Sequence, residues 1–121
     1  MGARFLPRLV TFLRGSASAS RQHFTVQVTG ARETTHGYQV KAEVCLRKVP
    51  SGFDFFVPVS LSPWAVAAGG NRVKATSKGS TFDETELTEG DCHAGWIRFN
   101  TKGKKVSTIH YRNSLGENVH W

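Results

Sequence analysis

The chain has 121 residues, 39% of them apolar, and 16 Lys and Arg side chains against 9 Asp and Glu, for a formal net charge of +7. The length suits a single domain, and the apolar share argues against wholesale disorder. Four of the arginines lie in residues 1–21, which hold no acidic residue. A nucleic-acid-binding domain usually concentrates its basic side chains on one face of the fold. We therefore do not expect a nucleic-acid partner.

Residues 1–21 resemble a degraded export signal. Apolar residues on helical spacing are interspersed with arginines, and a Ser/Ala run follows at 16–20. Arg8 interrupts the apolar region, which leaves three interpretations: a weak or misassigned export signal, a disordered extension, or an amphipathic surface anchor. No stretch reaches the roughly 18 apolar residues that span a bilayer. We therefore treat 1–21 as a leader or extension and 22–121 as the domain.

Apolar residues at every second position predict β-strands in the first half of the domain. The pattern runs through residues 24–28, 38–46 and 53–61, and residues 30–37 between the first two runs are polar and predict a turn. Pro58 lacks a backbone donor, so the third strand is expected at a sheet edge or with a break.

The second half of the domain continues the same pattern. Trp64 and Val66 predict a short strand that enters a Gly-Gly hairpin, and residues 82–89 predict a solvated acidic loop without the spacing of a calcium site. Further strands are expected at 96–99, 106–111 and 119–121, with Trp96 and Phe99 in the core. Seven or eight short strands with regular turns predict an all-β, immunoglobulin-like antiparallel sandwich.

The chain has two cysteines, Cys45 and Cys92. One disulfide is the natural pairing and would imply an oxidising compartment, while two unrelated buried thiols in a cytosolic protein remain the alternative. Alternation directs Cys45 away from the apolar face of its strand. Either a bulge re-aims its side chain, or the disulfide lies on the outer side of the sheet.

Histidines and acids suggest a metal site only at first sight. The candidates are Asp91, His93, His110 and His120, but no histidine pair has the HxxxH spacing of a helical zinc site. His93 adjoins Cys92, yet neighbours on a strand point to opposite faces, which argues against a catalytic dyad. We expect no metal, no cofactor and no enzymatic activity.

Three lysines mark a predicted hairpin tip, Lys102, Lys104 and Lys105. They could form a basic patch, extended by Arg72, Lys74 and Lys78, or they could serve solubility and edge protection. Because no aromatic residue is interleaved as a base-stacking platform, an anionic polymer suits this turn better than nucleic acid does.

Several structural motifs together resemble a known family. They are Val40 to Leu46, Ser62-Pro63-Trp64, Leu87, Gly90, Cys92, Gly95-Trp96-Ile97, Phe99, the stretch Tyr111 to Gly116, and Trp121. The chain is similar to immunoglobulin-like domains of secreted or lipid-anchored actinobacterial proteins, distant relatives of the small immunogenic antigen that mycobacteria secrete. The resemblance implies an extracytoplasmic β-sandwich in which Cys45 and Cys92 pair, and it supplies no catalytic residues. Residues 1–21 depart from the uninterrupted export signal that is usual in that family.

The predicted function is that of a non-enzymatic, secreted or cell-surface domain. We expect a monomer without a transmembrane span that binds a protein or an anionic polymer of the cell envelope. The alternative is a basic intracellular adaptor that binds nucleic acid or another polyanion through the Lys102 to Lys105 turn.

Overall fold

The computed structural model describes residues 23–53 and 55–121, so the predicted leader at 1–21 lies outside the described residues. The described part folds into nine antiparallel strands and contains no helix, hence none that could cross a membrane. The strands are β1 (Phe24–Glu33), β2 (Tyr38–Leu46), β3 (Phe56–Val59), β4 (Trp64–Ala68), β5 (Asn71–Thr76), β6 (Thr85–Thr88), β7 (Cys92–Phe99), β8 (Val106–Arg112) and β9 (Asn118–His120).

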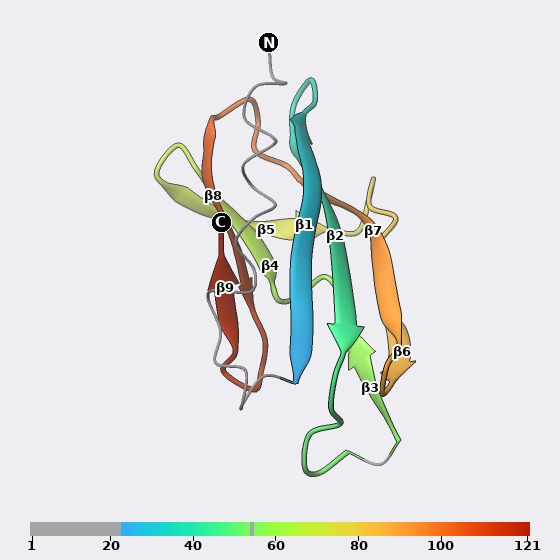
Figure 1. The fold of residues 1–121 in the computed structure, drawn as a ribbon. Coiled ribbons are helices and arrows are strands. Elements are labelled where there is room, and N and C mark those ends of the chain that lie inside the picture. The colour runs from blue at the N-terminus through green and yellow to red at the C-terminus, as the bar shows by residue number, and fades with distance from the viewer. Residues whose placement is uncertain (1–22, 54) are drawn as a thin grey trace.

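The strands form two packed layers (Figure 1), which confirms the predicted sandwich. One continuous sheet has the order β1-β2-β7-β5-β4-β8-β9, and a separate two-stranded sheet joins β3 to β6. Strands β1, β2 and β7 form the first layer, and β4, β8 and β9 lie in the second. Strand β5 connects the layers, because its first residues pair with β4 while Ala75 and Thr76 pair with β7. The predicted hairpin between β4 and β5 is confirmed, with Gly69 and Gly70 at positive φ in its turn.

The core lies between the layers and takes its side chains from both. Its largest fully buried members are Trp64, Phe82, Phe99, Leu46, Ile97 and Ile109. On β2 the buried residues are every second one, as the alternation predicted. This packing turns one face of each layer outward, where charged side chains such as Lys41, Glu43 and Arg98 lie.

Strand β1 is longer than predicted. It continues to Glu33 through a bulge between Val28 and Gly30, so the predicted polar turn is confined to the residues that follow. The extra residue of a bulge shifts the side-chain alternation by one position. Ala31 is therefore buried, and Arg32 points outward.

The prediction of a strand at 53–61 is wrong at both ends. Only Phe56–Val59 forms β3, and Phe53 and Phe55 are exposed because no element covers them. Strand β3 pairs only with β6, which confirms the edge position expected from Pro58.

The predicted acidic loop at 82–89 is also only partly right. Its acids are exposed, but Thr85–Thr88 forms β6 and pairs with β3. Leu87 of β6 turns its side chain into the core, and Phe82 is fully buried. The segment is thus part of the sandwich.

Candidate functional site

The two cysteines form a disulfide, as predicted. Cys45 and Cys92 are direct partners in the β2–β7 register, and their sulfurs are bonded. Both residues lie on the outer face of the sheet, which confirms the second of the two placements considered from the sequence, and the bulge occurs in β1 instead. Glu43 lies close to both sulfurs. A disulfide has no thiolate to offer a metal ion, so this cluster is not a ligand set.

Asp91, His93, His110 and His120 do not form a metal-ligand group within the described part of the chain. His93 points inward, where its ring contacts that of Phe82 at 4.6 Å between centroids and its Nε2 lies 2.9 Å from the carbonyl oxygen of Asp83. Asp91 instead accepts hydrogen bonds from the backbone and the hydroxyl of Thr88, which hold the pKa of its carboxyl below the ordinary value.

The other two histidines face each other on the outer side of the second layer. His110 and His120 are register partners of β8 and β9, with ring centroids 6.1 Å apart. Partial burial lowers the pKa of His110, and the positive charges of Arg72 and His120 lower it further. The neutral imidazole of His110 is therefore favoured, with its Nε2 2.9 Å from the hydroxyl of Thr108.

The lysine turn forms an exposed tip, as predicted, and its backbone is fixed on both sides. Lys102 adopts a φ of 56°, and its N–H donates to the carbonyl of His36 in the β1–β2 turn. The N–H of Gly69 donates to the carbonyl of Lys105, so the β4–β5 hairpin adjoins the turn. All three lysine side chains are exposed. Their role as a polyanion contact stays a prediction.

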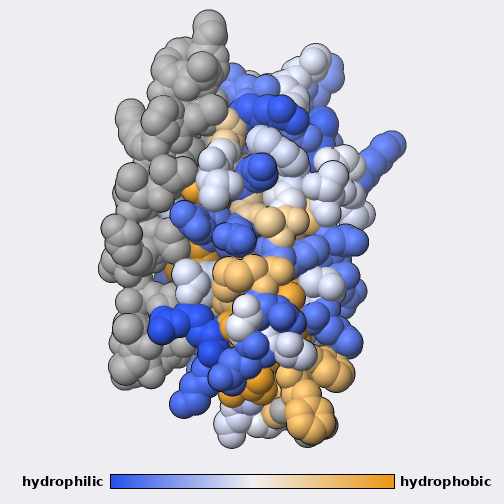
Figure 2. All heavy atoms as spheres, turned by 45° about the vertical axis from the view of Figure 1, so that its right-hand side comes forward, coloured by the Kyte–Doolittle hydropathy of each residue, from blue (hydrophilic) through white to orange (hydrophobic). Residues whose placement is uncertain are grey.

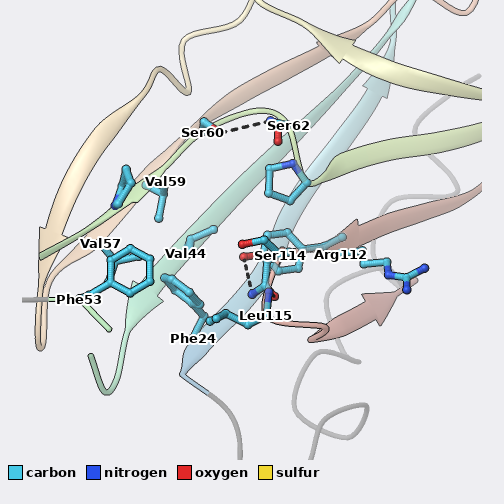
Figure 3. A pocket seen from close by; sticks show the side chains of 14 residues that line it. Phe24, Val44, Phe53, Val57, Val59, Ser60, Ser62, Arg112, Ser114 and Leu115 are labelled. Atoms are coloured by element: carbon cyan, nitrogen blue, oxygen red, sulfur yellow. Dashed lines mark hydrogen bonds between the residues drawn. The ribbon is translucent and has the colours of Figure 1, made fainter. Parts of the chain in front are cut away.

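A pocket of about 180 Å³ opens at the opposite end of the sandwich. Figure 3 shows Phe53 and Val57 on one side of it and Leu115 on the other, with Phe24 and Val44 between them. Serine side chains line part of its rim, namely Ser60, Ser62 and Ser114. The sequence did not predict this pocket, because its walls come from the starts and ends of strands that are distant along the chain.

Two exposed hydrophobic residues, Phe53 and Leu115, line the pocket, and Phe55 and Phe56 follow Phe53 closely along the chain. In Figure 2 hydrophobic residues gather at the lower end of the molecule, where the turn into β3 lies in Figure 1. Phe55 is 79% exposed, and Phe53 and Phe56 are 41% and 43% exposed. Together with Leu115 at 39%, these are the exposed large hydrophobic residues of the described chain. We call these four residues the apolar end.

Trp96 is not a core residue, contrary to the prediction. It lies three positions before buried Phe99 on β7, and alternation places the two on opposite faces of the strand. The guanidinium carbon of Arg32 lies 4.3 Å from the centre of the indole ring. The first layer therefore presents an aromatic side chain on its outer face, beneath an arginine.

These features define a class of protein, a disulfide-stapled, immunoglobulin-like β-sandwich with an apolar pocket at one end. Among solved structures, a secreted protein of Mycobacterium tuberculosis, MPT63, has a similar fold, with a TM-score of 0.63 and 14% sequence identity over 92% of this chain and 87% of that one. The expected likeness to the secreted mycobacterial antigen is thus confirmed at the level of the fold. No family model matches the sequence, and no curated protein does.

Proposed function

We propose that this protein is an extracellular, non-enzymatic binding module whose apolar end receives a hydrophobic side chain of a partner protein. The observation that carries the proposal is that four large hydrophobic residues are exposed, Phe53, Phe55, Phe56 and Leu115, and that two of them, Phe53 and Leu115, line the pocket. Exposed apolar patches of this kind mark interaction sites on soluble proteins.

The dimensions and chemistry of the pocket favour a protein partner. Its volume of about 180 Å³ is below the roughly 300 to 1,000 Å³ typical of small-molecule sites. Aromatic anchors within a polar rim are typical of protein–protein interfaces, and here serines border the phenylalanines. One inserted side chain, flanked by Phe53 and Leu115, suits this arrangement.

The disulfide supports the extracellular part of the proposal. Cys45 is half-buried and Cys92 is exposed, so a reducing cytosol would have access to the bond, whereas secreted proteins keep such bonds. The fold shared with a secreted protein agrees with this location. Both sulfurs are committed to the disulfide, which supports a non-enzymatic role because neither can act as a nucleophile.

The proposal is tested by site-specific photocrosslinking from position 55, followed by affinity measurement with the partner recovered. We expect Leu115→Ser or Phe53→Ser to weaken that complex by roughly 30-fold, the effect of losing an interface hot spot. Lys74→Gln, on the outer face of the second layer, is the matched control and leaves the affinity unchanged. The protein could instead sediment with lipid vesicles, lose this sedimentation when Phe55 is replaced, and give no protein crosslink. That result would show that the apolar end binds membranes and that a protein partner is wrong.

We propose polyanion binding by Lys102, Lys104 and Lys105 as a second candidate function. The observation that favours it is the fixed backbone of this turn, which holds three exposed lysines on one tip. Replacing all three with serine is expected to abolish salt-sensitive retention on a polyanion column. Retention that survives the triple replacement would contradict this role. The disulfide argues against the intracellular version of this function.

A further inference from the structure

The guanidinium of Arg32 is held in place from two directions. Its carbon stacks over the indole of Trp96 at 4.3 Å, and its Nε donates to the amide oxygen of Gln39 at 2.8 Å. Among the described residues its two terminal nitrogens have no hydrogen-bond or ion-pair partner. A guanidinium that is already oriented loses less entropy when it binds a carboxylate with both nitrogens.

The bulge in β1 is what places Arg32 on this face. Before the bulge, even-numbered residues such as Val26 and Val28 point into the core. The extra residue at Val28/Gly30 reverses the alternation, so Arg32 points outward and is opposite Gln39. Gly30 adjoins the ring, since a Cβ there would be in ordinary van der Waals contact with Cη2 of Trp96 at 3.9 Å.

A second arginine lies in the same row across the strands. The register aligns Arg32 of β1 with Gln39 of β2 and Gln39 with Arg98 of β7. The Arg98 side chain is flanked by two glycines: a Cβ on Gly37 would lie 3.0 Å from its Nη2, and a Cβ on Gly79 would lie 2.7 Å from its Cδ. Arg32 and Arg98 thus lie on either side of Gln39 in one row of the outer face, and the absence of side chains on Gly37 and Gly79 leaves room for the side chain of Arg98.

The neighbouring rows carry groups that suit sugar hydroxyls. Lys41 pairs with Trp96 in the next row, and Gln27 pairs with Glu43 in the row beyond. Rows on one face repeat every two residues, so Glu43 lies about 13 Å from the arginine row along the strands. A carboxylate in this position repels a plain polyanion but accepts hydrogen bonds from hydroxyl groups.

We propose that the outer face of β1, β2 and β7 binds an acidic polysaccharide. Arg32 and Arg98 take the carboxylates of the sugar chain, Gln39 lies between them, and Glu43 and Gln27 accept or donate hydrogen bonds to hydroxyls. The positive charges of Arg32 and Arg98 favour an anionic chain. The row of Gln27 and Glu43 favours a sugar chain over a polyanion without hydroxyl groups, because the Glu43 carboxylate repels further anionic groups. This surface is separate from the apolar end, so either site can fail while the other stands.

The test uses polygalacturonate as the probe and the fluorescence of Trp96 as the signal. Trp64 and Trp121 are 1% and 7% exposed, so a ligand on this face would alter the emission of Trp96. We expect saturable binding to the full chain. Arg32→Gln and Arg98→Gln should each weaken it by roughly tenfold, the usual effect of losing a charged hydrogen bond. The matched control Arg72→Gln removes the same charge from β5 and should change affinity by less than about twofold.

Three outcomes would overturn the proposal. Equal affinity for polyglutamate, which has carboxylates but no sugar, would mean that charge alone is recognised. An equal loss in Arg72→Gln would mean that the attraction is diffuse. Absence of binding to polygalacturonate at low salt would show that this face is not a polysaccharide-binding site. Weaker binding by the Trp96→Leu variant would support the proposal without a change of charge, because the loss of the indole leaves the guanidinium of Arg32 free to move. Binding of this variant, which lacks the fluorescent signal, is measured by sedimentation.

Discussion

The indole of Trp64 stacks on that of Trp121, with ring centroids 5.9 Å apart and 11° between the planes. Trp64 also meets the rings of Phe82 and Tyr111 edge-on. The backbone of Trp121 exchanges two hydrogen bonds with Ile109 of β8. This aromatic cluster joins β4, β8 and the segment before β6 in the core.

We expect Trp121→Ala to lower the free energy of unfolding by about 3 kcal/mol, because it removes a buried ring and leaves a cavity. Urea denaturation checks the value. Trp96→Ala removes the same side chain from the outer face and should cost about 1 kcal/mol. Equal losses in the two variants would contradict the placement of these rings.

Removing the disulfide should cost considerably more than a surface substitution. The bond joins residues 47 apart, and the chain-entropy model assigns a loop of that length about 4 kcal/mol. The double variant Cys45→Ala/Cys92→Ala is compared with the native protein in guanidinium denaturation, with and without reductant. Intact mass should rise by about 2 Da on reduction of the native protein alone. Native material with two free thiols would contradict the pairing.

Both tyrosines should resist ionisation until the protein unfolds. Burial raises the pKa of Tyr38 and of Tyr111 from 10.0 to about 12, with the acids Glu33 and Glu117 adding to the respective shifts. The unfolded chain therefore loses its phenolic protons first, so stability that is present below pH 10 is lost as the pH rises toward 12. Near-ultraviolet absorbance should show tyrosinate only together with unfolding, and Tyr111→Phe should reduce the alkaline loss of stability. Early tyrosinate absorbance in the folded protein would contradict the burial.

Gly95 should tolerate no side chain. A Cβ there would lie 2.8 Å from both the N and the Cα of Phe82, which are backbone atoms that cannot rotate away. We expect Gly95→Ala to destabilise the fold by about 3 kcal/mol in thermal unfolding. Gly30→Ala is the matched strand control, because its Cβ would meet ordinary contacts at 3.7 Å and 3.9 Å and should stay within about 1 kcal/mol of the native protein. A similar loss at both positions would refute this explanation.

Local pattern predicted the strands whose inner faces are covered along their whole length. On β2 and on the β4–β5 hairpin, alternation and turn residues agree with the tertiary structure. Alternation cannot show whether another element covers an apolar face, and so it predicts a strand at Phe53 and Phe55 although both side chains are exposed. The burial of Phe82 depends on Gly95, thirteen positions away, which no local pattern shows.

Prediction of the candidate sites requires the strand register, which the sequence pattern does not show. The outer position of the disulfide is one of the two placements that the alternation around Cys45 allows. The row of Arg32, Gln39 and Arg98 does not follow from alternation, because it requires a bulge and the pairing of three strands. A glycine in a strand is a weak sign of a bulge, and the polar residues that follow Gly30 favour a turn there instead.

The position of the Cys45–Cys92 bond also determines how far the molecule can be stretched. The bond joins two strands of one layer, and β3, β4, β5 and β6 all lie inside the loop that it closes. A force applied between Phe24 and Trp121 would pass through the bond and leave that loop unloaded. At full extension the oxidised chain would be shorter than the reduced chain by about 160 Å, at roughly 3.4 Å for each of the 47 residues of separation. The redox state of its surroundings would thus set the mechanical extensibility of the domain.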